Sequence, residues 1–314
     1  MVIRPLGKTG LQTAEIAFGG WAIGGSRHEW AYGPTDDAQS RRAIRTALEL
    51  GCTLFDTADV YGRGHSECLL GEELASVRSS VLIATKIGFD FYHGETVHNL
   101  HPAYLRFALH RSLDRLRTDH VDILQLHNPP RNVLCSPELI TTLERLRNQG
   151  KARVLGVSAA TVDDAIAAVA AGWPEVVQVP YNMLAPEAEF ALFPLATSRG
   201  VAALCREVLA NGLLSGKYDK LHRFAEGDIR ALWPHDLVEG ILRQVETLQP
   251  YRRQGESMAQ LAIRFALEAP AVSAVICGCK TSAQVRENFA TPGRHSTLNL
   301  KRTAAAATAV LPCA

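Results

Sequence analysis

The chain has 314 residues, of which 47% are hydrophobic and 21% charged, so it is long for an ordinary single domain but normal for one α/β barrel. Its 33 basic and 32 acidic side chains leave a net charge of +1, which gives no long-range attraction to nucleic acid or membrane lipid and mildly favours a small-molecule partner. The seven cysteines are scattered, no apolar run approaches the roughly 20 residues that span a bilayer, and the start does not resemble a signal peptide. Together these features predict a cytoplasmic protein.

The first element that the sequence predicts is a β-hairpin, in which residues 3–6 and 11–16 flank Gly7-Lys8-Thr9-Gly10. Short β-branched runs then alternate with stretches of helical periodicity, a rhythm typical of a parallel sheet wrapped by helices. We expect strands at residues 15–18, 53–55, 81–85, 121–126, 153–157, 176–179, 201–204 and 273–276. We expect helices near residues 36–50, 65–75, 102–117, 136–149, 161–171, 186–199, 257–268 and 281–290. Eight strand–helix units favour an α/β fold closed into a (β/α)8 TIM barrel over an open doubly wound sheet.

One segment breaks this rhythm. Residues 208–235 form a long stretch with several glycines after the seventh strand, and loops of this length are usually functional or disordered. The tail after about residue 291 is rich in alanine, and we predict no chemistry for it. We therefore expect a single barrel domain over residues 1–314, with the tail peripheral and no linker.

Polar side chains follow three consecutive predicted strands. Asp56 and Tyr61 come after the second strand, Lys86 after the third and His127 after the fourth. The carboxyl ends of barrel strands form the active face, so we expect these side chains to converge. Reduction of a carbonyl needs a hydride donor and an acid that protonates the developing alkoxide. Lys86 would stabilise the Tyr61 phenolate, Asp56 would hold the lysine charged, and the His127 imidazole would hydrogen-bond the substrate oxygen.

Each of these four residues also has a structural interpretation. Asp56 can cap the following segment, Tyr61 can be a core aromatic, and a lone His127 is more often structural than catalytic. Lys86 is harder to explain in this way, because an unpaired buried lysine is costly. We expect no metal site, since no second His or Cys stands at ligand spacing from His127. The four together favour catalysis where each alone does not.

Several motifs resemble those of the aldo-keto reductase superfamily, and together they cover nearly the whole chain. The matching stretches are Arg4-Pro5-Leu6-Gly7-Lys8-Thr9-Gly10-Leu11, the turn at 19–25, Asp56-Thr57-Ala58-Asp59-Val60-Tyr61-Gly62, Thr85-Lys86, Leu126-His127, residues 150–158, Gln178-Val179-Pro180-Tyr181-Asn182, residues 212–218 and Glu287-Asn288. The turn that carries Trp21, and Arg206, are similar to the bacterial general-stress-type branch and to the related potassium-channel β subunits.

This resemblance implies an NAD(P)(H)-dependent oxidoreductase that reduces aldehydes or ketones to alcohols, or the reverse, with Asp56, Tyr61, Lys86 and His127 as its catalytic tetrad. The absence of a G-x-G-x-x-G fingerprint argues against a Rossmann site and is expected within this superfamily. The implied cofactor contacts are Gly20, Trp21 and Asp56 at the nicotinamide, Ser158 and Gln178 at its carboxamide, Arg206, Leu209, Gly212, Leu214, Lys217 and Arg230 at the pyrophosphate, and Gly278, Lys280, Gln284, Glu287 and Asn288 at the adenosine. We expect the substrate pocket to include Trp30, Tyr61 and His127, with further walls from Tyr32, Phe89, Phe91, Tyr92 and the 208–235 segment.

Two positions depart from the pattern of the superfamily. Asparagine usually follows the serine at the end of the fifth strand, whereas this chain has Ala159. Many members carry arginine for the 2′-phosphate where this chain has Gln284, so Lys280 or Arg286 would supply that charge. We expect NADP(H) first, with NAD(H) as the alternative.

Two other functions stay open at this point. One is a nucleotide-binding regulatory protein with little turnover, similar to a channel β subunit, and the other is an unrelated barrel enzyme such as a lyase or isomerase. The sequence predicts a small carbonyl or alcohol as substrate, but it identifies neither the compound, the direction of the reaction nor the oligomeric state.

Overall fold

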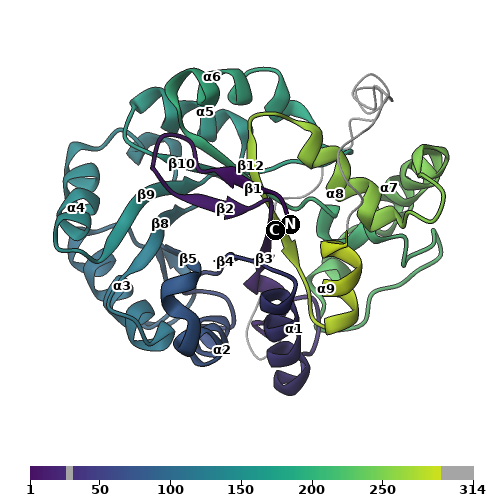
Figure 1. The fold of residues 1–314 in the computed structure, drawn as a ribbon, viewed down its shortest axis with the longest axis horizontal. Coiled ribbons are helices and arrows are strands. Elements are labelled where there is room, and N and C mark those ends of the chain that lie inside the picture. The colour runs from purple at the N-terminus through teal and green to yellow at the C-terminus, as the bar shows by residue number, and fades with distance from the viewer. Residues whose placement is uncertain (26–30, 291–314) are drawn as a thin grey trace.

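The structure is a computed structural model, and it describes residues 1–25 and 31–290. Parallel strands close into an eight-stranded barrel (Figure 1), which confirms the predicted (β/α)8 fold. Each barrel strand overlaps a predicted one. The strands, in order around the barrel, are β3 (Ile16–Gly19), β4 (Leu54–Asp56), β5 (Leu82–Ile87), β8 (Val121–His127), β9 (Ala152–Ser158), β10 (Val176–Pro180), β11 (Ala202–Arg206) and β12 (Val272–Gly278).

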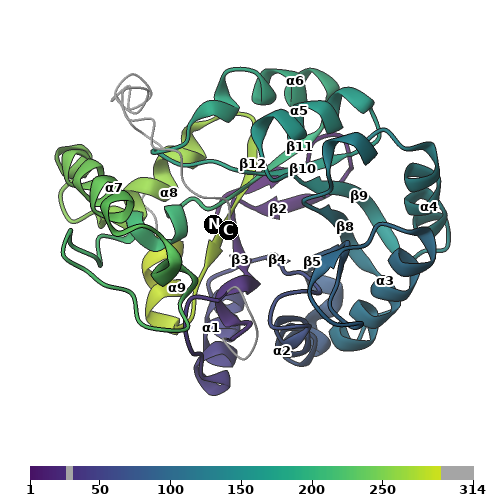
Figure 2. The same cartoon turned by 180° about the vertical axis from the view of Figure 1, so that it is seen from behind.

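Helices surround the barrel on its outside (Figure 2). Side chains of Asp36, Ser136, Thr161, Ser257 and Thr281 each accept a hydrogen bond from a backbone N–H in the first turn of the helix that follows, which explains where these helices begin. The helices are α1 (Asp37–Glu49), α2 (His65–Leu74), α3 (Pro102–Leu116), α4 (Pro137–Asn148), α5 (Val162–Ala171), α6 (Leu192–Arg199), α7 (His235–Leu248), α8 (Met258–Glu268) and α9 (Ser282–Phe289). Within the described ranges, none of them has the length and apolarity needed to cross a bilayer.

The predicted N-terminal hairpin, β1 (Ile3–Pro5) and β2 (Gln12–Ala14), lies across the barrel in Figure 1 and closes its floor. Leu6 is fully buried against apolar side chains inside the barrel, including Ala17 and Leu54. Arg4 forms an ion pair with Glu15 and donates hydrogen bonds to the backbone oxygens of Leu267 and Val272. The lower half of the barrel is therefore a packed core, and only its upper rim is available for chemistry.

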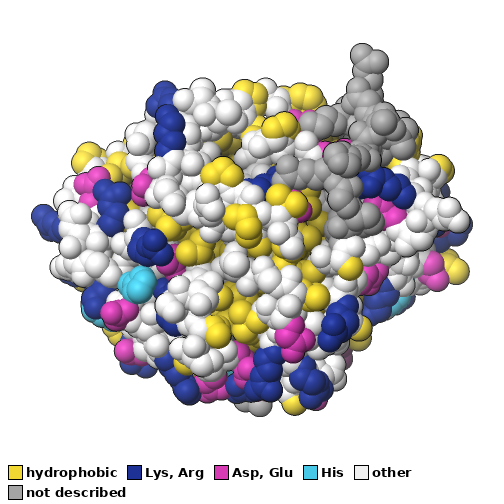
Figure 3. All heavy atoms as spheres, viewed as in Figure 1, with side chains coloured by type: hydrophobic (Ala, Val, Ile, Leu, Met, Phe, Trp, Pro, Cys, Tyr) yellow, Lys and Arg dark blue, Asp and Glu magenta, His cyan; other side chains and the backbone are white. Residues whose placement is uncertain are grey.

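The face that carries this hairpin shows acidic and basic side chains interspersed around its edge (Figure 3), as expected for a nearly neutral chain. Met1, Val2 and Ile3 are among the large hydrophobic residues that remain exposed. On this face, the described residues in Figure 3 therefore form no large patch of one charge sign. Such a patch is the kind of surface that attracts nucleic acid.

One helix and one short hairpin were not predicted. Helix α7 follows the long segment after β11, and its buried residues Val238, Ile241, Leu242, Val245 and Leu248 have helical spacing that the sequence interpretation missed. A short hairpin, β6 (Phe89–Asp90) and β7 (Val97–His98), follows β5. The predicted loop itself contains two 3₁₀ turns, at Ala210–Ser215 and Ile229–Leu232, before α7 begins.

Two glycines inside helices predict opposite effects on stability. A Cβ added to Gly71 in α2 would lie 2.3 Å from the backbone oxygen of Arg115 at the end of α3, whereas one added to Gly240 in α7 would meet nothing within 4 Å. We expect Gly71→Ala to lower the free energy of unfolding by about 1–3 kcal/mol, because the two helices must separate. Gly240→Ala should raise it by about 0.5–1 kcal/mol, because alanine loses less backbone entropy. Urea unfolding of both variants tests this, and an equal gain in both would show that α2 and α3 do not pack so closely.

Candidate active site

A cavity of about 920 Å³ opens at the carboxyl ends of the barrel strands. It runs from Tyr61 and His127 to α9 and is bordered on one side by the segment between β11 and α7. The residues of the predicted sites that line it are Gly20, Trp21, Asp56, Tyr61, His127, Gln178, Arg206, Leu209, Gly212, Lys217, Arg230, Gly278, Lys280, Gln284, Glu287 and Asn288.

Other predicted site residues do not line the cavity. Lys86, Ser158 and Leu214 are buried beneath its wall. Trp30 lies outside the described residues. Their roles therefore stay predictions, although burial of Lys86 still leaves its ammonium in contact with Tyr61.

The predicted pocket walls are correct in part. Tyr32 and Phe89 line the cavity. Phe91 and Tyr92 are not among its lining residues. Their rings stack on each other with centroids 4.3 Å apart, and Tyr92 packs against Phe107 of α3. Their role as pocket walls therefore stays a prediction.

Lys86 is the centre of the polar cluster at the bottom of the cavity. Its Nζ donates to Asp56 Oδ1 at 2.5 Å, to the backbone oxygen of Thr57 at 2.9 Å and to the hydroxyl of Tyr61 at 3.2 Å. Burial opposes the charge on this fully buried lysine, but Asp56 foremost and then Tyr61 outweigh that effect and raise the pKa of Lys86. The sequence placed these side chains on neighbouring strand ends, and the structure brings them into contact.

The other oxygen of Asp56 is held by two glutamines. Asp56 Oδ2 accepts hydrogen bonds from Gln178 Nε2 at 2.8 Å and from Gln125 Nε2 at 3.2 Å. Sequence reasoning missed Gln125, although one signal was present. It lies two residues before His127 and therefore on the same inward face of β8, in a strand whose other inward residues are mostly apolar.

His127 is a buried, neutral imidazole at the cavity wall. Its ring packs edge-on against Tyr61, with centroids 5.7 Å apart, and against Phe89 at 5.1 Å. Burial above all, and then the positive charges of Lys86 and Arg206, lower the pKa of His127 well below its usual range. A neutral imidazole can donate one hydrogen bond without carrying charge into the site.

Tyr61 is positioned by close backbone packing. The residue after it, Gly62, has a φ of +59°, and a Cβ there would lie only 2.0 Å from the backbone oxygen of Gly24. This contact brings the Tyr61 loop onto the 3₁₀ turn Gly20–Ile23, where the Trp21 ring stacks on Tyr61 with centroids 5.8 Å apart. A side chain at 62 would push the phenol away from Lys86.

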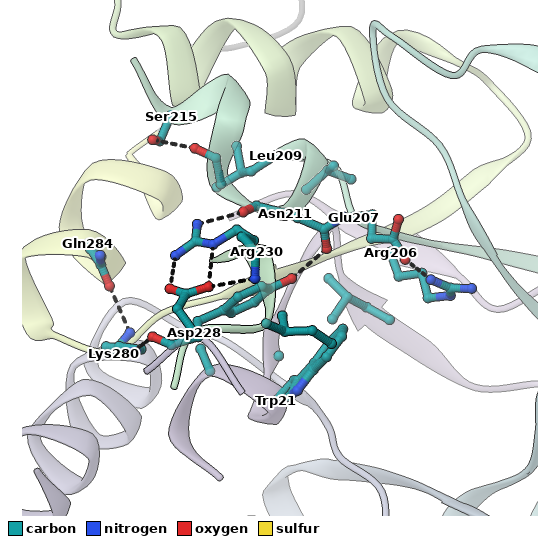
Figure 4. A pocket seen from close by; sticks show the side chains of 18 of the residues that line it. Trp21, Arg206, Glu207, Leu209, Asn211, Ser215, Asp228, Arg230, Lys280 and Gln284 are labelled. Atoms are coloured by element: carbon teal, nitrogen blue, oxygen red, sulfur yellow. Dashed lines mark hydrogen bonds and ion pairs between the residues drawn. The ribbon is translucent and has the colours of Figure 1, made fainter. Parts of the chain in front are cut away.

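A second polar cluster lies in the middle of the cavity, between Arg206 and Lys280 (Figure 4). The Arg230 guanidinium forms two hydrogen bonds with the Asp228 carboxylate, at 2.9 and 2.6 Å, and donates to the backbone oxygen of Asn211 at 2.8 Å. It also lies over the rings of Phe224 and Tyr32, at 4.2 and 4.7 Å from their centroids. Arg230 therefore ties together the two 3₁₀ turns of the loop besides lining the cavity.

Lys280 connects the end of β12 to the segment before α1. Its ammonium donates to the backbone oxygens of Tyr32, Gly33 and Pro34, and its backbone N–H donates to Gln284 Oε1 at 2.7 Å. Burial lowers the pKa of Lys280, and nearby Arg230 adds to this effect while Asp228 opposes it. The lysine thus places a positive charge at the end of the cavity that α9 borders.

Arg206 contacts the residue that follows Ser158, where the superfamily pattern has asparagine. Its guanidinium forms an ion pair with Glu207 and donates to the backbone oxygen of Ala159 at 3.1 Å. Glu207 has a φ of +56° and itself lines the cavity.

Comparison with known proteins agrees with the motifs. A model of the Aldo/keto reductase family matches residues 15–293. Aldo-keto reductase YhdN of Bacillus subtilis is 31% identical over 91% of this chain and 87% of that protein. A probable voltage-gated potassium channel subunit beta of Arabidopsis thaliana is 31% identical over 92% of this chain and 90% of that protein. Among solved structures, the glycerol dehydrogenase AKR11B4 from Gluconobacter oxydans superposes with a TM-score of 0.80 at 27% identity, covering 99% of this chain and 98% of that one.

Asp59, in the loop that leads to Tyr61, predicts a pH-dependent loss of stability. Burial, and then the negative charge of Glu67, raise the pKa of Asp59 well above its usual range. The folded protein therefore holds this proton to a higher pH than the unfolded chain, so the free energy of unfolding falls as the pH rises above the unfolded pKa. We expect Asp59→Asn to remove this contribution, so that its stability relative to the wild type improves between about pH 5 and about pH 7, by up to about 1.4 kcal/mol per pH unit.

Urea unfolding across this pH range measures the difference. Asp236→Asn, at an exposed aspartate of α7, controls for the loss of one charge. If the free energy of unfolding changes with pH in the same way in the wild type and in Asp59→Asn, the folded protein does not retain the proton of Asp59.

Proposed function

The chain belongs to the aldo/keto reductase family, whose members are oxidoreductases that act on carbonyls with a nicotinamide cofactor, and on this premise we propose that it reduces aldehydes or ketones to alcohols, or catalyses the reverse, with Tyr61 as the proton-transfer residue. One observation carries the proposal: the Lys86 ammonium lies between the Asp56 carboxylate and the Tyr61 hydroxyl at the base of the cavity. This arrangement suits a phenol that must give up and regain a proton.

The proton step follows from these contacts. A bound nicotinamide dinucleotide supplies or removes the hydride. In the direction of reduction, the Tyr61 hydroxyl gives its proton to the carbonyl oxygen, and Lys86 stabilises the phenolate that remains. In the direction of oxidation, the phenolate accepts the proton of the alcohol. Asp56 keeps the lysine charged and oriented in both directions.

His127 would orient the substrate oxygen. It lines the cavity, while its Nδ1 is buried and has no hydrogen-bond partner among the described residues, so Nε2 is the nitrogen that can reach a ligand. Because the imidazole is neutral, it polarises the carbonyl by donating a hydrogen bond rather than by competing with Tyr61 for the proton.

The residues at the cavity fit a nicotinamide dinucleotide. The cavity is continuous from Tyr61 to Asn288, and its volume lies near the upper end of the range for small-ligand sites. The Ser158 hydroxyl is buried at the end of β9 without a hydrogen-bond partner in the described part of the chain, beside Gln178 of β10. Ser158 and Gln178 would hold the carboxamide, and the loop residues from Arg206 to Arg230 would hold the pyrophosphate.

The charges that line the cavity favour NADP(H) as the cofactor, with NAD(H) as the alternative. Arg206 and Arg230 are paired with Glu207 and Asp228, whereas no carboxylate of the described residues forms an ion pair with Lys217 or Lys280. Arg286, the other candidate from the sequence, is absent from the lining of the cavity and lies 3.8 Å from Glu49. We therefore assign the charge that meets a 2′-phosphate to Lys280, supported by Lys217.

Tyr61→Phe tests the proton-transfer role. We expect the variant to fold and to bind NADPH within about twofold of the wild type, while kcat for a simple aldehyde falls by about 10³, because the proton donor is gone. NADPH consumption with a panel of aldehydes and ketones is the measurement. Tyr251→Phe, at a tyrosine remote from the cavity, is the matched control. Turnover near the wild-type rate in Tyr61→Phe would remove this residue from the mechanism, and a wild type that binds NADPH but reduces nothing would favour the regulatory alternative.

Lys280→Met tests the cofactor preference. We expect the Kd for NADPH to rise about tenfold, since a phosphate loses its charge-assisted partner, while the Kd for NADH changes by less than about threefold. Binding isotherms for both cofactors give the ratio of the two Kd values. Damage to the segment at residues 32–34, whose backbone Lys280 binds, would weaken NADH binding as well. Arg286 lies on α9, the helix that follows Lys280, and is not among the residues that line the cavity. Arg286→Met should therefore leave the Kd values for NADPH and NADH unchanged. Equal losses for both cofactors would contradict the assignment.

A further inference from the structure

The side chain of Arg115, near the end of α3, packs against the loop that carries Tyr61. A Cβ added to Gly64, three residues after the tyrosine, would lie only 2.5 Å from both Cδ and Nε of the arginine. Gly64 is the N-cap residue of α2, and its φ of +91° lies in the left-handed region that favours glycine. The absence of a side chain there therefore lets the arginine lie directly on the backbone of the loop.

Two partners fix the guanidinium of Arg115 in this place. Its Nε donates to Glu67 Oε2 at 2.7 Å, and its Nη1 donates to the hydroxyl of Tyr92, in the turn between β6 and β7, at 2.6 Å. Only 13% of the arginine side chain is exposed, and the side chain of Glu67 is fully buried. A lysine could not bind both partners in this way, because it lacks the planar fork of N–H donors that a guanidinium presents.

Glu67 connects the same ion pair to the strand that carries Lys86. Its second oxygen, Oε1, accepts a hydrogen bond from Thr85 Oγ1 at 2.6 Å. Thr85 and Lys86 are neighbours on β5, and successive side chains of a strand point to opposite faces, so Thr85 meets α2 outside the barrel while Lys86 points inside. One buried ion pair is therefore in contact both with the loop of Tyr61 and with the strand of the lysine that this tyrosine meets.

The side chain at the start of the loop adds no anchor of its own. Asp59, two residues before Tyr61, is fully buried, yet neither of its carboxyl oxygens has a hydrogen-bond partner in the described part of the chain. Burial and then Glu67 raise the pKa of Asp59, whereas Arg115 opposes them, so the ion pair lies close to this residue as well. One backbone hydrogen bond, from the N–H of Asp59 to the oxygen of Lys86, holds the loop here. Further support on this side must come from packing, which Arg115 provides.

The turn at Gly20–Ile23, with Gly24 after it, supports the loop from the opposite side. The barrel order β3–β4–β5–β8 places the loop after β4 between that turn, which follows β3, and α3, which leads into β8. At 3.2 Å, the contact with the Tyr61 hydroxyl is the longest of the three hydrogen bonds that Lys86 donates. A displacement of the loop by about half an ångström is therefore enough to take the phenol out of hydrogen-bond distance.

From these contacts we infer that Arg115 is a positioning residue for proton transfer: it holds the loop in place and thereby keeps the Tyr61 hydroxyl within hydrogen-bond distance of Lys86. This inference rests on the proposed function. Arg115 acts through Tyr61, because it is not among the residues that line the cavity and so meets neither substrate nor cofactor.

The test removes the ion pair without changing the net charge, by combining Arg115→Met with Glu67→Gln. We expect the Kd for NADPH to stay within about twofold of the wild type, while kcat for a simple aldehyde falls at least about tenfold. In the oxidation of the corresponding alcohol, the pH at which kcat reaches half its maximum should rise by about one unit, because the phenolate loses its contact with the ammonium. Asp56, Lys86 and His127 stay unchanged beside the phenol.

A matched control removes another ion pair between the same helices. Arg117, two residues after Arg115, forms an ion pair with Glu72 of α2 at 2.8 Å, and 58% of its side chain is exposed. Arg117→Met with Glu72→Gln should leave kcat and the pH profile at their wild-type values, because this pair is exposed to solvent. Glu67→Gln alone retains the arginine and should produce no upward shift of the pH profile. Urea unfolding shows that each variant is folded under the assay conditions.

Three outcomes would overturn the inference: wild-type kcat and pH profile in Arg115→Met with Glu67→Gln, an equal upward shift in the control, or an equal shift in Glu67→Gln alone. Arg115→Lys disturbs the fold less, because it keeps the charge beside Glu67 and loses only the guanidinium fork. It should shift the pH profile in the same direction, and wild-type behaviour of this variant would also contradict the role. If the wild type reduces no aldehyde, or Tyr61→Phe keeps its turnover, the proposed function fails instead, so the two failures are distinguishable.

Discussion

The site depends on one buried ion pair, between Lys86 and Asp56. Removing two charges from water costs more than their mutual attraction returns unless the remaining hydrogen-bonding groups are also satisfied. In this barrel they are: the ammonium reaches Thr57 and Tyr61, and the second carboxylate oxygen accepts from two glutamines. The tyrosine is therefore one member of a polar unit drawn from four strands, and its position is determined by the same contacts that make the buried charges tolerable.

The pairing of charged side chains differs from one part of the cavity to another. At the lower end the imidazole of His127 is neutral, and the Arg206 guanidinium beside the strand ends is paired with Glu207. In the middle Arg230 is neutralised by Asp228, whereas Lys217 and Lys280 carry positive charge without an ion pair among the described residues. Positive charge thus remains at Lys217 and Lys280, in a part of the cavity that Glu287 of α9 also lines.

The parts of this structure that the sequence predicted depend on local patterns. The alternation of strands and helices, the N-terminal hairpin and the tetrad at consecutive strand ends follow from periodicity and from the geometry of parallel barrels. Helix α7 had a clear apolar pattern and was missed only because the preceding segment was interpreted as an interruption. Other features depend on distant residues: Tyr92 packs against Phe107 of α3, and the partners of Gln125 come from strands far away in sequence. No local signal encodes such contacts.

Gly156 has a consequence for protein engineering. Most attempts to change a binding site replace side chains that touch the ligand, yet here Gln125 of β8 and Gln178 of β10 meet across β9, which contributes no side chain at that level. Even an alanine at this glycine would place its Cβ 2.7 Å from the backbone oxygen of Val176 and 3.3 Å from Gln125 Cγ, so the strand or the glutamine would have to shift. The side of the cavity that Gln178 lines is thus constrained from behind, and a redesign of its chemistry must begin inside the barrel rather than at its mouth.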